Sequence, residues 1–407
     1  MGYLGYKPAD KPLTSADITD SIITSAKIAD GTIVNADINA SAAIASTKLS
    51  GITSPAAFRN IVINGDMQVA QRSTSVASIT TAGYYTLDRF KTLISSLGTF
   101  TQSQSTDVPS GYGFTSSLKM DCTTADASPS AGDYLLLQQL FEGQNLQYLK
   151  KGTANAVSLT ASFWVKSTKT GTFICELQDT DNSRSISKSY TVSVSNTWEF
   201  KTVTFAGDTT GAFTNDNGVS LALNFWLGAG TNFTSGTLAT SWGSEVTANR
   251  VVGQVNIADS TSNDWLITGV QLEAGTSATD FEFLPYDVDL LRCQRYYEKS
   301  YDQATYAGAS GTPAGYTMTY ANNGVTTSSY IGCSERFKTE KRASPTMTSY
   351  DWSGNSGKCT RGTLAVGNEA NSNWSFESAT TSSWIGYSDG GSTRNFIALH
   401  WVANSEL

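Results

Sequence analysis

Leu159-Thr-Ala-Ser-Phe-Trp-Val-Lys is the stretch that says most about the fold. Apolar and polar residues largely alternate along it, which is typical of a half-buried strand. Three further runs have the same texture: Trp198-Glu-Phe-Lys-Thr-Val-Thr-Phe, Leu221-Ala-Leu-Asn-Phe-Trp-Leu and Trp265-Leu-Ile-Thr-Gly-Val-Gln-Leu. Turn clusters such as Gly207-Asp-Thr-Thr-Gly and Asn215-Asp-Asn-Gly separate these runs, as in an antiparallel sandwich. We therefore predict a double-sheet jelly roll over residues 57–286.

The composition of the whole chain favours an all-β protein of two or three domains. The 407 residues are 11% aromatic and only 15% charged, with 35 Gly and 5 Met. Aromatic residues suit a pleated, half-buried surface, and glycine supplies turns. A helical bundle would need more helix-forming residues, so this class is excluded.

Charge and hydropathy limit the partners. A net charge of −8 argues against affinity for phosphates, so we expect no nucleic-acid partner. No stretch approaches 18 apolar residues, and we expect neither a signal peptide nor membrane insertion. Five cysteines without a Cys-x-x-Cys pair indicate neither a zinc site nor a disulfide framework, and we expect free, buried thiols. No motif indicates a bound metal or a cofactor.

The N-terminal segment, residues 1–56, carries a five-residue repeat. Its bulky members recur with one step of six: Ile18, Ile23, Ile28, Ile33, Ile38, Ile44 and Leu49. A five-residue step keeps to no single face of a helix or strand, so this row needs neighbouring chains or a solenoid to cover it. We favour three chains wound about a shared axis, with a polar, disordered linker as the alternative.

The C-terminal part, residues 287–407, is predicted to be a second β unit. The pattern turns briefly helical at Asp287-Val-Asp-Leu-Leu-Arg-Cys and returns to strand at Gln294-Arg-Tyr-Tyr-Glu-Lys-Ser-Tyr. The remainder is rich in Ser, Asn and Gly, which predicts a β-sandwich-like tip with long loops. We expect it to close on a hairpin made of Ser383-Trp-Ile-Gly-Tyr and Asn395-Phe-Ile-Ala-Leu-His-Trp-Val.

Several segments together resemble bacteriophage tail fibre and receptor-binding proteins with a carbohydrate-binding-module-like jelly roll. Besides the isoleucine repeat, they are Asn60-Ile-Val-Ile-Asn-Gly-Asp-Met-Gln-Val-Ala-Gln-Arg, Tyr85-Thr-Leu-Asp-Arg-Phe, Ile267-Thr-Gly-Val-Gln-Leu-Glu-Ala-Gly-Thr-Ser-Ala-Thr-Asp-Phe-Glu, Cys293-Gln-Arg-Tyr-Tyr-Glu-Lys-Ser, Phe337-Lys-Thr-Glu-Lys-Arg-Ala-Ser-Pro-Thr-Met-Thr and Asn404-Ser-Glu-Leu. The resemblance implies a homotrimer in the virion, made in the host cytoplasm. Residues 1–56 would contact other tail proteins, and the C-terminal domain would meet a host surface glycan or outer-membrane receptor.

An enzymatic function finds little support in the sequence. Gly386-Tyr-Ser-Asp-Gly matches the Gly-x-Ser-x-Gly pattern of a nucleophile elbow, but turn residues and a strand follow it, where an elbow needs a helix. The chain's one histidine, His400, lies within an alternating strand run. We therefore predict no catalytic residues. Cleavage of a polysaccharide by two carboxylates stays open, because sequence cannot show such a pair.

Sugar recognition needs flat apolar rings beside amide and hydroxyl groups. Loop-like surroundings place aromatic rings and amides together in the C-terminal part, and the candidate glycan-binding residues there are Tyr350, Trp352, Asn371, Asn373 and Trp374. Aromatic residues within the strand runs are predicted to be core instead: Phe163, Trp164, Phe225, Trp226 and Trp265.

The sequence thus favours a non-enzymatic tail fibre that binds a host glycan or protein during adsorption. A tail-associated polysaccharide depolymerase and a purely structural virion fibre are the alternatives. Whether the jelly roll itself binds sugar or acts as a spacer is left open.

Overall fold

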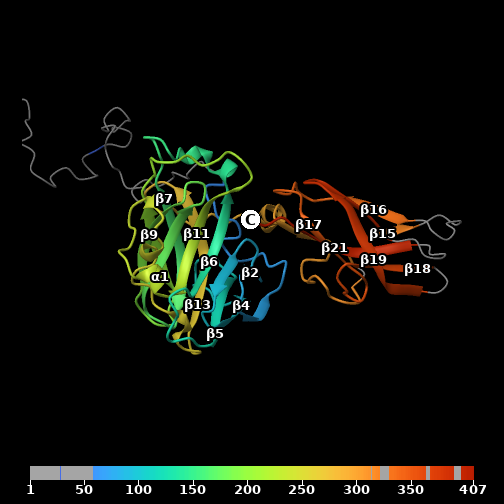
Figure 1. The fold of residues 1–407 in the computed structure, drawn as a ribbon, viewed down its shortest axis with the longest axis horizontal. Helices are drawn as coiled ribbons and strands as arrows, with labels where there is room; N and C mark the ends of the chain where they lie inside the picture. The colour runs from blue at the N-terminus through green and yellow to red at the C-terminus, as the bar shows by residue number, and fades with distance from the viewer. Residues whose placement is uncertain (1–27, 29–57, 313, 321–329, 364–366, 389–395) are drawn as a thin grey trace, which may run out of the picture. The chain divides into compact units, whose positions relative to one another are not determined.

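The computed structural model describes residues 28, 58–312, 314–320, 330–363, 367–388 and 396–407 (Figure 1). The chain divides into two compact units, Met1–Ala57 and Phe58–Leu407. Almost all described residues belong to the second unit, which consists of β-sheets with short helices. The all-β prediction is therefore confirmed, whereas the separate domain boundary predicted at 286/287 stays a prediction.

The first part of this unit is a sandwich of two antiparallel sheets packed face to face (Figure 1). One sheet, sheet A, has the order β1-β4-β5-β13-β7-β10. Its strands are β1 (Ser75–Ile79), β4 (Thr99–Ser105), β5 (Ser117–Thr124), β7 (Leu159–Ser167), β10 (Glu199–Phe205) and β13 (Asp264–Ala274). Strands distant in the chain lie side by side, as the jelly-roll prediction requires.

The opposite sheet, sheet B, has the order β12-β9-β8-β11-β6-β3-β2. Its strands are β2 (Gly83–Tyr84), β3 (Lys91–Ser95), β6 (Tyr134–Glu142), β8 (Gly171–Asp179), β9 (Arg184–Val192), β11 (Val219–Ala229) and β12 (Gly243–Ser244). Short helices lie in the connections: α1 (Thr231–Thr234), η5 (Gly143–Asn145), η6 (Gln147–Leu149), η7 (Thr247–Asn249) and η8 (Ile257–Asp259).

The core of the sandwich follows from strand alternation. In β7, Ala161, Phe163 and Val165 point inward and are fully buried, while Trp164 points to the other side. Phe225 of β11 meets Phe163 across the core, with ring centroids 5.0 Å apart. Large apolar side chains from both sheets therefore fill one continuous core, which drives the two sheets together.

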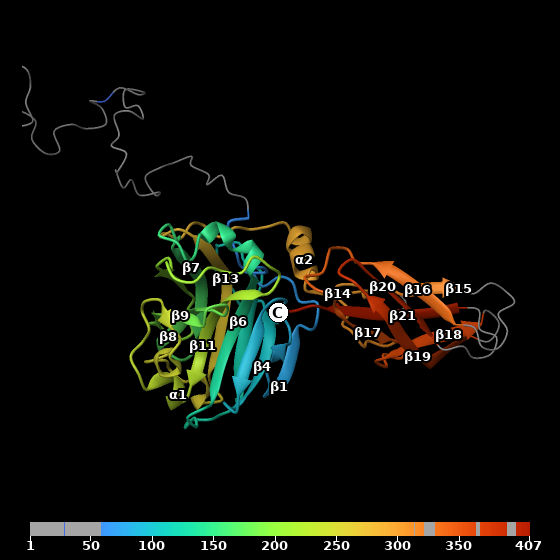
Figure 2. The same ribbon diagram turned by 45° about the horizontal axis from the view of Figure 1, so that its top comes forward.

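The C-terminal part begins with helix α2 (Tyr286–Gln294), which leads from the jelly roll into the next strands (Figure 2). These form a sheet of order β14-β21-β18-β19-β20-β16, and β15 and β17 also pair with β21. The strands are β14 (Tyr297–Lys299), β15 (Thr317–Tyr320), β16 (Ile331–Arg336), β17 (Thr346–Tyr350), β18 (Lys358–Thr363), β19 (Gly367–Ala379), β20 (Ser383–Ser388) and β21 (Phe396–Asn404).

The predicted terminal hairpin is wrong. Strand β20 pairs with β16 and β19, whereas β21 pairs with β14, β15, β17 and β18. Eight consecutive residues of β21, Phe396–Ala403, are buried. A strand buried on both faces belongs in the middle of a sheet, and strands from elsewhere in the chain occupy its flanks.

Ion pairs join the C-terminal part to the jelly roll. The Glu406 side chain is 5% exposed and accepts hydrogen bonds from Arg72 and Arg89, and the centroid of the Tyr296 ring lies 3.5 Å from the Arg89 guanidinium carbon. Arg295, just after α2, makes a two-point contact with Glu142 of β6. These pairs hold the described strands of residues 58–407 as one unit.

One smaller prediction is also tested. The five cysteines lie outside disulfides, and all but the half-buried Cys333 are buried, as predicted. Among the described residues, no helix is both long and apolar enough to cross a membrane.

Candidate functional site

A row of aromatic rings lies on the outer face of sheet A. Trp164 of β7 is directly opposite Phe200 of β10 in the antiparallel register. Because both residues point away from the core, their rings meet outside it, with centroids 5.4 Å apart and planes at 51°. Phe200 keeps 49% of its surface exposed, so this contact is not part of the sandwich core.

A loop between β4 and β5 adds a third ring. Tyr112 is 55% exposed, and its ring centroid lies 4.3 Å from that of Trp164, at an interplanar angle of 48°. Gly111 and Gly113 flank it, both with φ of +84°. A residue with a side chain would be strained at that φ, so the two glycines allow the turn that presents Tyr112.

A second aromatic wall faces this row. The rings of Phe114, Phe281 and Phe283 pack together, with centroid distances between 4.8 and 5.2 Å. Gly269 of β13 lies beneath Phe114, where a Cβ atom would come within 2.6 Å of the ring. Gly269 also lies in a β-bulge of β13, between Thr268 and Gln271. The bulge and the missing side chain together let Phe114 approach the sheet.

These two walls line a cavity of about 600 Å³, here called the aromatic cleft. Its lining residues are Gly111, Tyr112, Phe114, Ser162, Trp164, Phe200, Gly269, Ala278, Thr279, Asp280, Phe281 and Phe283. The polar groups come from Ser162 and from Thr279-Asp280. Apolar rings with a few polar groups at one edge are typical of a pocket for a small or extended ligand.

The polar edge of the cleft is held in place by buried neighbours. Thr279 donates from its backbone N–H and its hydroxyl to the buried carboxylate of Glu273. Arg59 donates to the Thr279 hydroxyl at 2.8 Å and to the Asp280 carbonyl at 2.5 Å. These bonds fix the backbone and leave the Asp280 carboxylate at the surface.

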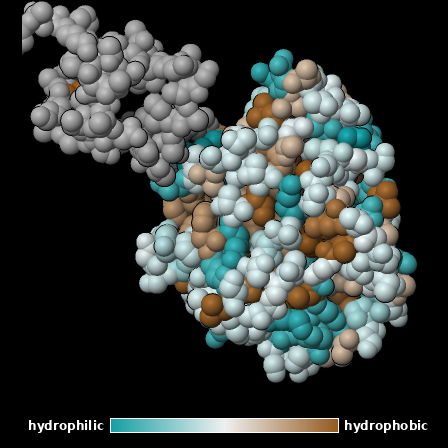
Figure 3. All heavy atoms as spheres, turned by 90° about the vertical axis from the view of Figure 1, so that its left-hand side faces the viewer, coloured by the Kyte–Doolittle hydropathy of each residue, from teal (hydrophilic) through white to brown (hydrophobic). Residues whose placement is uncertain are grey.

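Figure 3 looks onto the side of the molecule that is on the left in Figure 1. Apolar residues form separate patches there among polar ones. Such interrupted patches are ordinary for a protein surface, so exposed apolar residues by themselves do not mark a site. The aromatic cleft differs because its rings contact one another and enclose a cavity.

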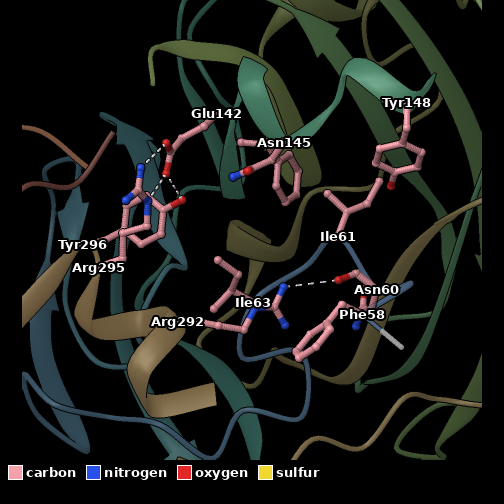
Figure 4. Close-up of a pocket in the computed structure, with 11 residues that line it drawn as sticks. Phe58, Asn60, Ile61, Ile63, Glu142, Asn145, Tyr148, Arg292, Arg295 and Tyr296 are labelled. Carbon is pink, nitrogen blue, oxygen red and sulfur yellow. Dashed lines mark hydrogen bonds and ion pairs between the residues drawn. The ribbon is translucent and has the colours of Figure 1, made fainter. Parts of the chain in front are cut away.

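A second cavity, of about 350 Å³, lies near the start of the described chain (Figure 4). In this view Arg295 and Tyr296 point at Glu142, Arg292 points at Asn60, and Tyr148 stands on the far side. Glu142 accepts from Arg295 Nε and Nη2, from the Tyr296 hydroxyl and from Gln144. Burial alone would raise the pKa of Glu142, but these hydrogen bonds outweigh burial and hold the pKa below its ordinary value. Glu142 is therefore paired with Arg295 in the wall of this cavity.

The sequence-predicted glycan residues are only partly together. Trp374 was expected in a loop, but it lies on β19 and is 7% exposed, in the core with Trp384. This expectation is wrong, because the Trp374 ring packs inside the hydrophobic core of the C-terminal part. Asn373 is exposed and accepts from Lys358 Nζ at 2.7 Å. The side chain of Asn371 lies outside the described residues.

Tyr350 and Trp352 are half-buried and belong to a group of stacked rings. Tyr301 and Tyr316 enclose the His400 ring, with centroids at 3.6 and 4.1 Å, and Trp352 stacks on Tyr316 at 5.7 Å. Tyr350 contacts Tyr301 edge to face. Trp352 therefore packs on Tyr316 at one end of the stack and keeps part of its surface exposed.

The Gly-x-Ser-x-Gly match does not form a nucleophile. Ser388 is fully buried on β20 and donates its hydroxyl hydrogen bond to the Asn373 carbonyl at 2.9 Å. His400 contacts Ser300 through Nδ1 and the Thr312 carbonyl through Nε2, at 3.0 and 2.8 Å. Burial lowers the pKa of His400, although its hydrogen bond to Thr312 opposes this. Both residues are occupied in packing.

The predicted trimer axis falls almost wholly outside the described residues. Its members Ile18, Ile23, Ile33, Ile38, Ile44 and Leu49 lie there. Ile28 is described and is 40% exposed in this single chain.

Sequence reasoning missed the aromatic cleft, because Trp164 was assigned to the core with Phe163. Phe163, Phe225, Trp226 and Trp265 are buried as predicted, but Trp164 is half-buried on the outer face. The alternation of strand residues indicates the outward position of Trp164. Adjacent strand residues point to opposite faces, so Phe163 and Trp164 cannot both face the core.

The comparisons with known proteins gave structural matches only. No protein-family model and no curated protein matches the chain. Among solved structures, it is similar to the enzymatically active domain of tailspike protein 4 from bacteriophage CBA120, with 16% identity over 53% of this chain and a TM-score of 0.29. The match spans 21% of that tailspike chain.

Two carbohydrate-binding domains are also similar to this chain. One is a family 11 carbohydrate-binding module from Clostridium thermocellum, with 11% identity, 49% of this chain, 99% of that chain and a TM-score of 0.23. The other is the xylan-binding domain CBM22-1 from Paenibacillus barcinonensis, with 8% identity, 55% of this chain, all of that chain and a TM-score of 0.24. At these low scores the matches assign neither a family nor a ligand.

Proposed function

We propose that this protein binds glycans through the aromatic cleft of its jelly roll, as part of a phage tail fibre that attaches the virion to a host surface. The observation that carries the glycan proposal is the contact of Tyr112, Trp164 and Phe200 on the outer face of sheet A. Two exposed rings that both contact the half-buried Trp164 are unexplained by core packing. Sugar rings present C–H faces that pack on such surfaces, and the exposed Asp280 carboxylate offers an acceptor for hydroxyl groups.

The tail-fibre role rests on the sequence resemblance and on the repeat in residues 1–56. In this proposal the repeat joins three chains and contacts other tail proteins. Three weak sites on one trimer bind a surface with avidity far above that of a single site, provided that the glycans are spaced to engage together. Tyr350, Trp352 and Asn373 remain proposed for a second contact in the C-terminal part. Trp374 is left out of this proposal because its side chain is buried.

A binding role is favoured over cleavage by the charge of the cleft. Hydrolysis of a glycosidic bond ordinarily uses two carboxylic acids on opposite sides of that bond. Asp280 is the single carboxylate among the residues that line the cleft. A depolymerase would instead release reducing ends from host polysaccharide, and a purely structural fibre would bind no host surface.

The glycan proposal is tested by affinity electrophoresis and by competition with phage adsorption, using the full chain. Trp164→Ala should weaken binding by about tenfold to a hundredfold, since stacking of one ring is of the order of 1–3 kcal/mol. The matched control is Tyr148→Ala, an aromatic residue that is 50% exposed in the other cavity. Equal binding by wild type and Trp164→Ala, with both folded, would remove the cleft from the function.

The assembly proposal is tested by light scattering after size exclusion. We expect a trimer of the full chain and a weakened trimer without residues 1–56. A trimer that survives the truncation would move assembly to the β domains. A monomer in both cases would contradict the fibre.

A further inference from the structure

We infer that the aromatic cleft selects uncharged glycans in single chains and discriminates against acidic glycans such as uronic acid or sialic acid polymers. The inference rests on the proposed function and names the ligand class of the same cleft. Two features of the structure carry it: the sign of the charge at the cleft, and the angles between its rings.

The available charge at the cleft is negative. Asp280 is the single charged residue among the twelve that line it, and it is exposed. Within the described part of the chain, no cation forms an ion pair with its carboxylate. A carboxylate accepts hydrogen bonds from sugar hydroxyl groups, but it repels a carboxylate on the ligand.

The cations near the cleft are already paired. Lys166, next but one to Trp164 on β7, lies 2.6 Å from Asp107, which also accepts from the Trp198 indole. Lys201 of β10 lies 2.6 Å from Glu199.

Arg59 is the remaining cation at the polar edge of the cleft. Its guanidinium is bound to the Thr279 hydroxyl and the Asp280 carbonyl, with Glu273 at 3.8 Å. An acidic sugar would therefore meet Asp280 without gaining a free cation to offset it.

The rings do not form one flat surface. The plane of Trp164 makes an angle of 48° with that of Tyr112 and of 51° with that of Phe200. A flat, crystalline polysaccharide surface packs best on rings that share one plane. The tilted rings and the opposite phenylalanine wall instead form a cleft that accepts one glycan chain from the side.

The test compares matched polymers on the full chain. Soluble neutral polysaccharides and their carboxymethylated forms, such as dextran with carboxymethyl dextran and hydroxyethyl cellulose with carboxymethyl cellulose, are measured beside an array of neutral and acidic bacterial glycans. Crystalline cellulose serves as the flat surface. We expect the strongest binding to a soluble neutral glycan, and at least about fivefold weaker binding to its carboxymethylated form at low salt. The difference should shrink as salt screens Asp280.

Asp280→Asn should bring the affinity for the acidic form close to that for the neutral form. Because the Asp280 side chain makes no contact on which the fold depends among the described residues, this variant should fold normally. The control is Asp287→Asn, which removes an exposed carboxylate outside the cleft and should leave the discrimination unchanged.

The outcomes separate the inference from the proposed function. Preference for an acidic glycan, or for crystalline cellulose, that is lost in Trp164→Ala would overturn the inference and leave glycan binding by the cleft intact. Equal discrimination by wild type and Asp280→Asn would also overturn it. Binding of no glycan by the folded chain, or binding that Trp164→Ala does not change, would count against the proposed function itself.

Discussion

The jelly roll buries Trp226 and Trp265 but leaves Trp164 at its surface, whereas the C-terminal sheet packs three tryptophans together inside. In the jelly roll, leucine, isoleucine, valine and phenylalanine from two broad sheets supply much of the core, and Trp164 is left half-buried on an outer face. In the C-terminal part, Trp374, Trp384 and Trp401 pack edge to face inside, with neighbouring ring centroids 6.1 and 6.0 Å apart.

The difference follows from size. A small β unit encloses little volume and buries a smaller share of its surface, so a few large rings must supply its core. A tryptophan within a Ser- and Asn-rich sequence is therefore no sign of exposure there. In the larger sandwich, Trp265 shares the core with many aliphatic and phenylalanine side chains, so the core does not need Trp164, which stays half-buried on the outer face.

The largest effect should come from removing a tryptophan of the C-terminal core. Trp384 is almost fully buried against Trp374, Phe376 and Trp401. Trp384→Ala should lower the free energy of unfolding by about 3–5 kcal/mol because it leaves a cavity. Trp164→Ala should cost less than about 1.5 kcal/mol, since the half-buried Trp164 ring packs against two exposed rings, Tyr112 and Phe200. Urea unfolding followed by circular dichroism measures both, and equal losses would contradict the comparison.

The same contrast explains what could be predicted from the sequence. Period-two alternation was sufficient for the β class and for the inward rings Phe163 and Trp265, and the change to a helical pattern was sufficient for helix α2. It could not supply the cleft, because Tyr112, Trp164, Phe200 and Phe283 come from four separate segments whose register only the fold determines. Strand β21 was predicted as half of a hairpin, although its long buried run is that of a central strand.

The two regions should also respond to acid with opposite signs. In the jelly roll, burial and the nearby Asp289 raise the pKa of Asp66 to about 6. Its Oδ1 is buried and has no hydrogen-bond partner among the described residues. The folded state therefore holds a proton that the unfolded state releases above its ordinary pKa of 3.8. The stability from this proton is complete below pH 4 and is lost as the pH rises through about 6.

Asp66→Asn should remove this dependence, since the amide resembles the protonated acid. Relative to the variant, wild type should lose up to about 3 kcal/mol of unfolding free energy between pH 4 and pH 7. Urea titrations at several pH values measure the difference, with Asp287→Asn as the exposed control. Parallel curves for wild type and Asp66→Asn would show that the Asp66 carboxyl titrates normally.

In the C-terminal sheet, His400 should act in the other direction and more weakly. Its pKa is lowered by burial between Tyr301 and Tyr316. The His400 side chain therefore takes up a proton near pH 6.5 in the unfolded state but stays neutral in the folded state at that pH. The free energy of unfolding falls as the pH drops below that value. Protonation would also turn Nδ1 from an acceptor for Ser300 into a donor.

His400→Gln keeps a donor for the Thr312 carbonyl but cannot titrate. It should therefore be less stable than wild type at pH 7.5 and should lose less stability on acidification to pH 5. An unfolding free energy that falls equally in both proteins would place the acid sensitivity elsewhere.

The smallest effect is expected for Trp352, whose role lies between those of the other tryptophans. It closes the stack on Tyr316 but remains half-buried. Trp352→Ala should cost about 1 kcal/mol of stability, the value of one aromatic contact. It should change the affinity of the full chain for a soluble glycan by less than about twofold, because the aromatic cleft is intact. If phage adsorption is nevertheless blocked less well by this variant than by wild type, the C-terminal part makes a separate contact with the host surface. If Trp352→Ala weakened soluble glycan binding as much as Trp164→Ala, the contrast between a spared tryptophan in the jelly roll and packed ones in the C-terminal sheet would fail.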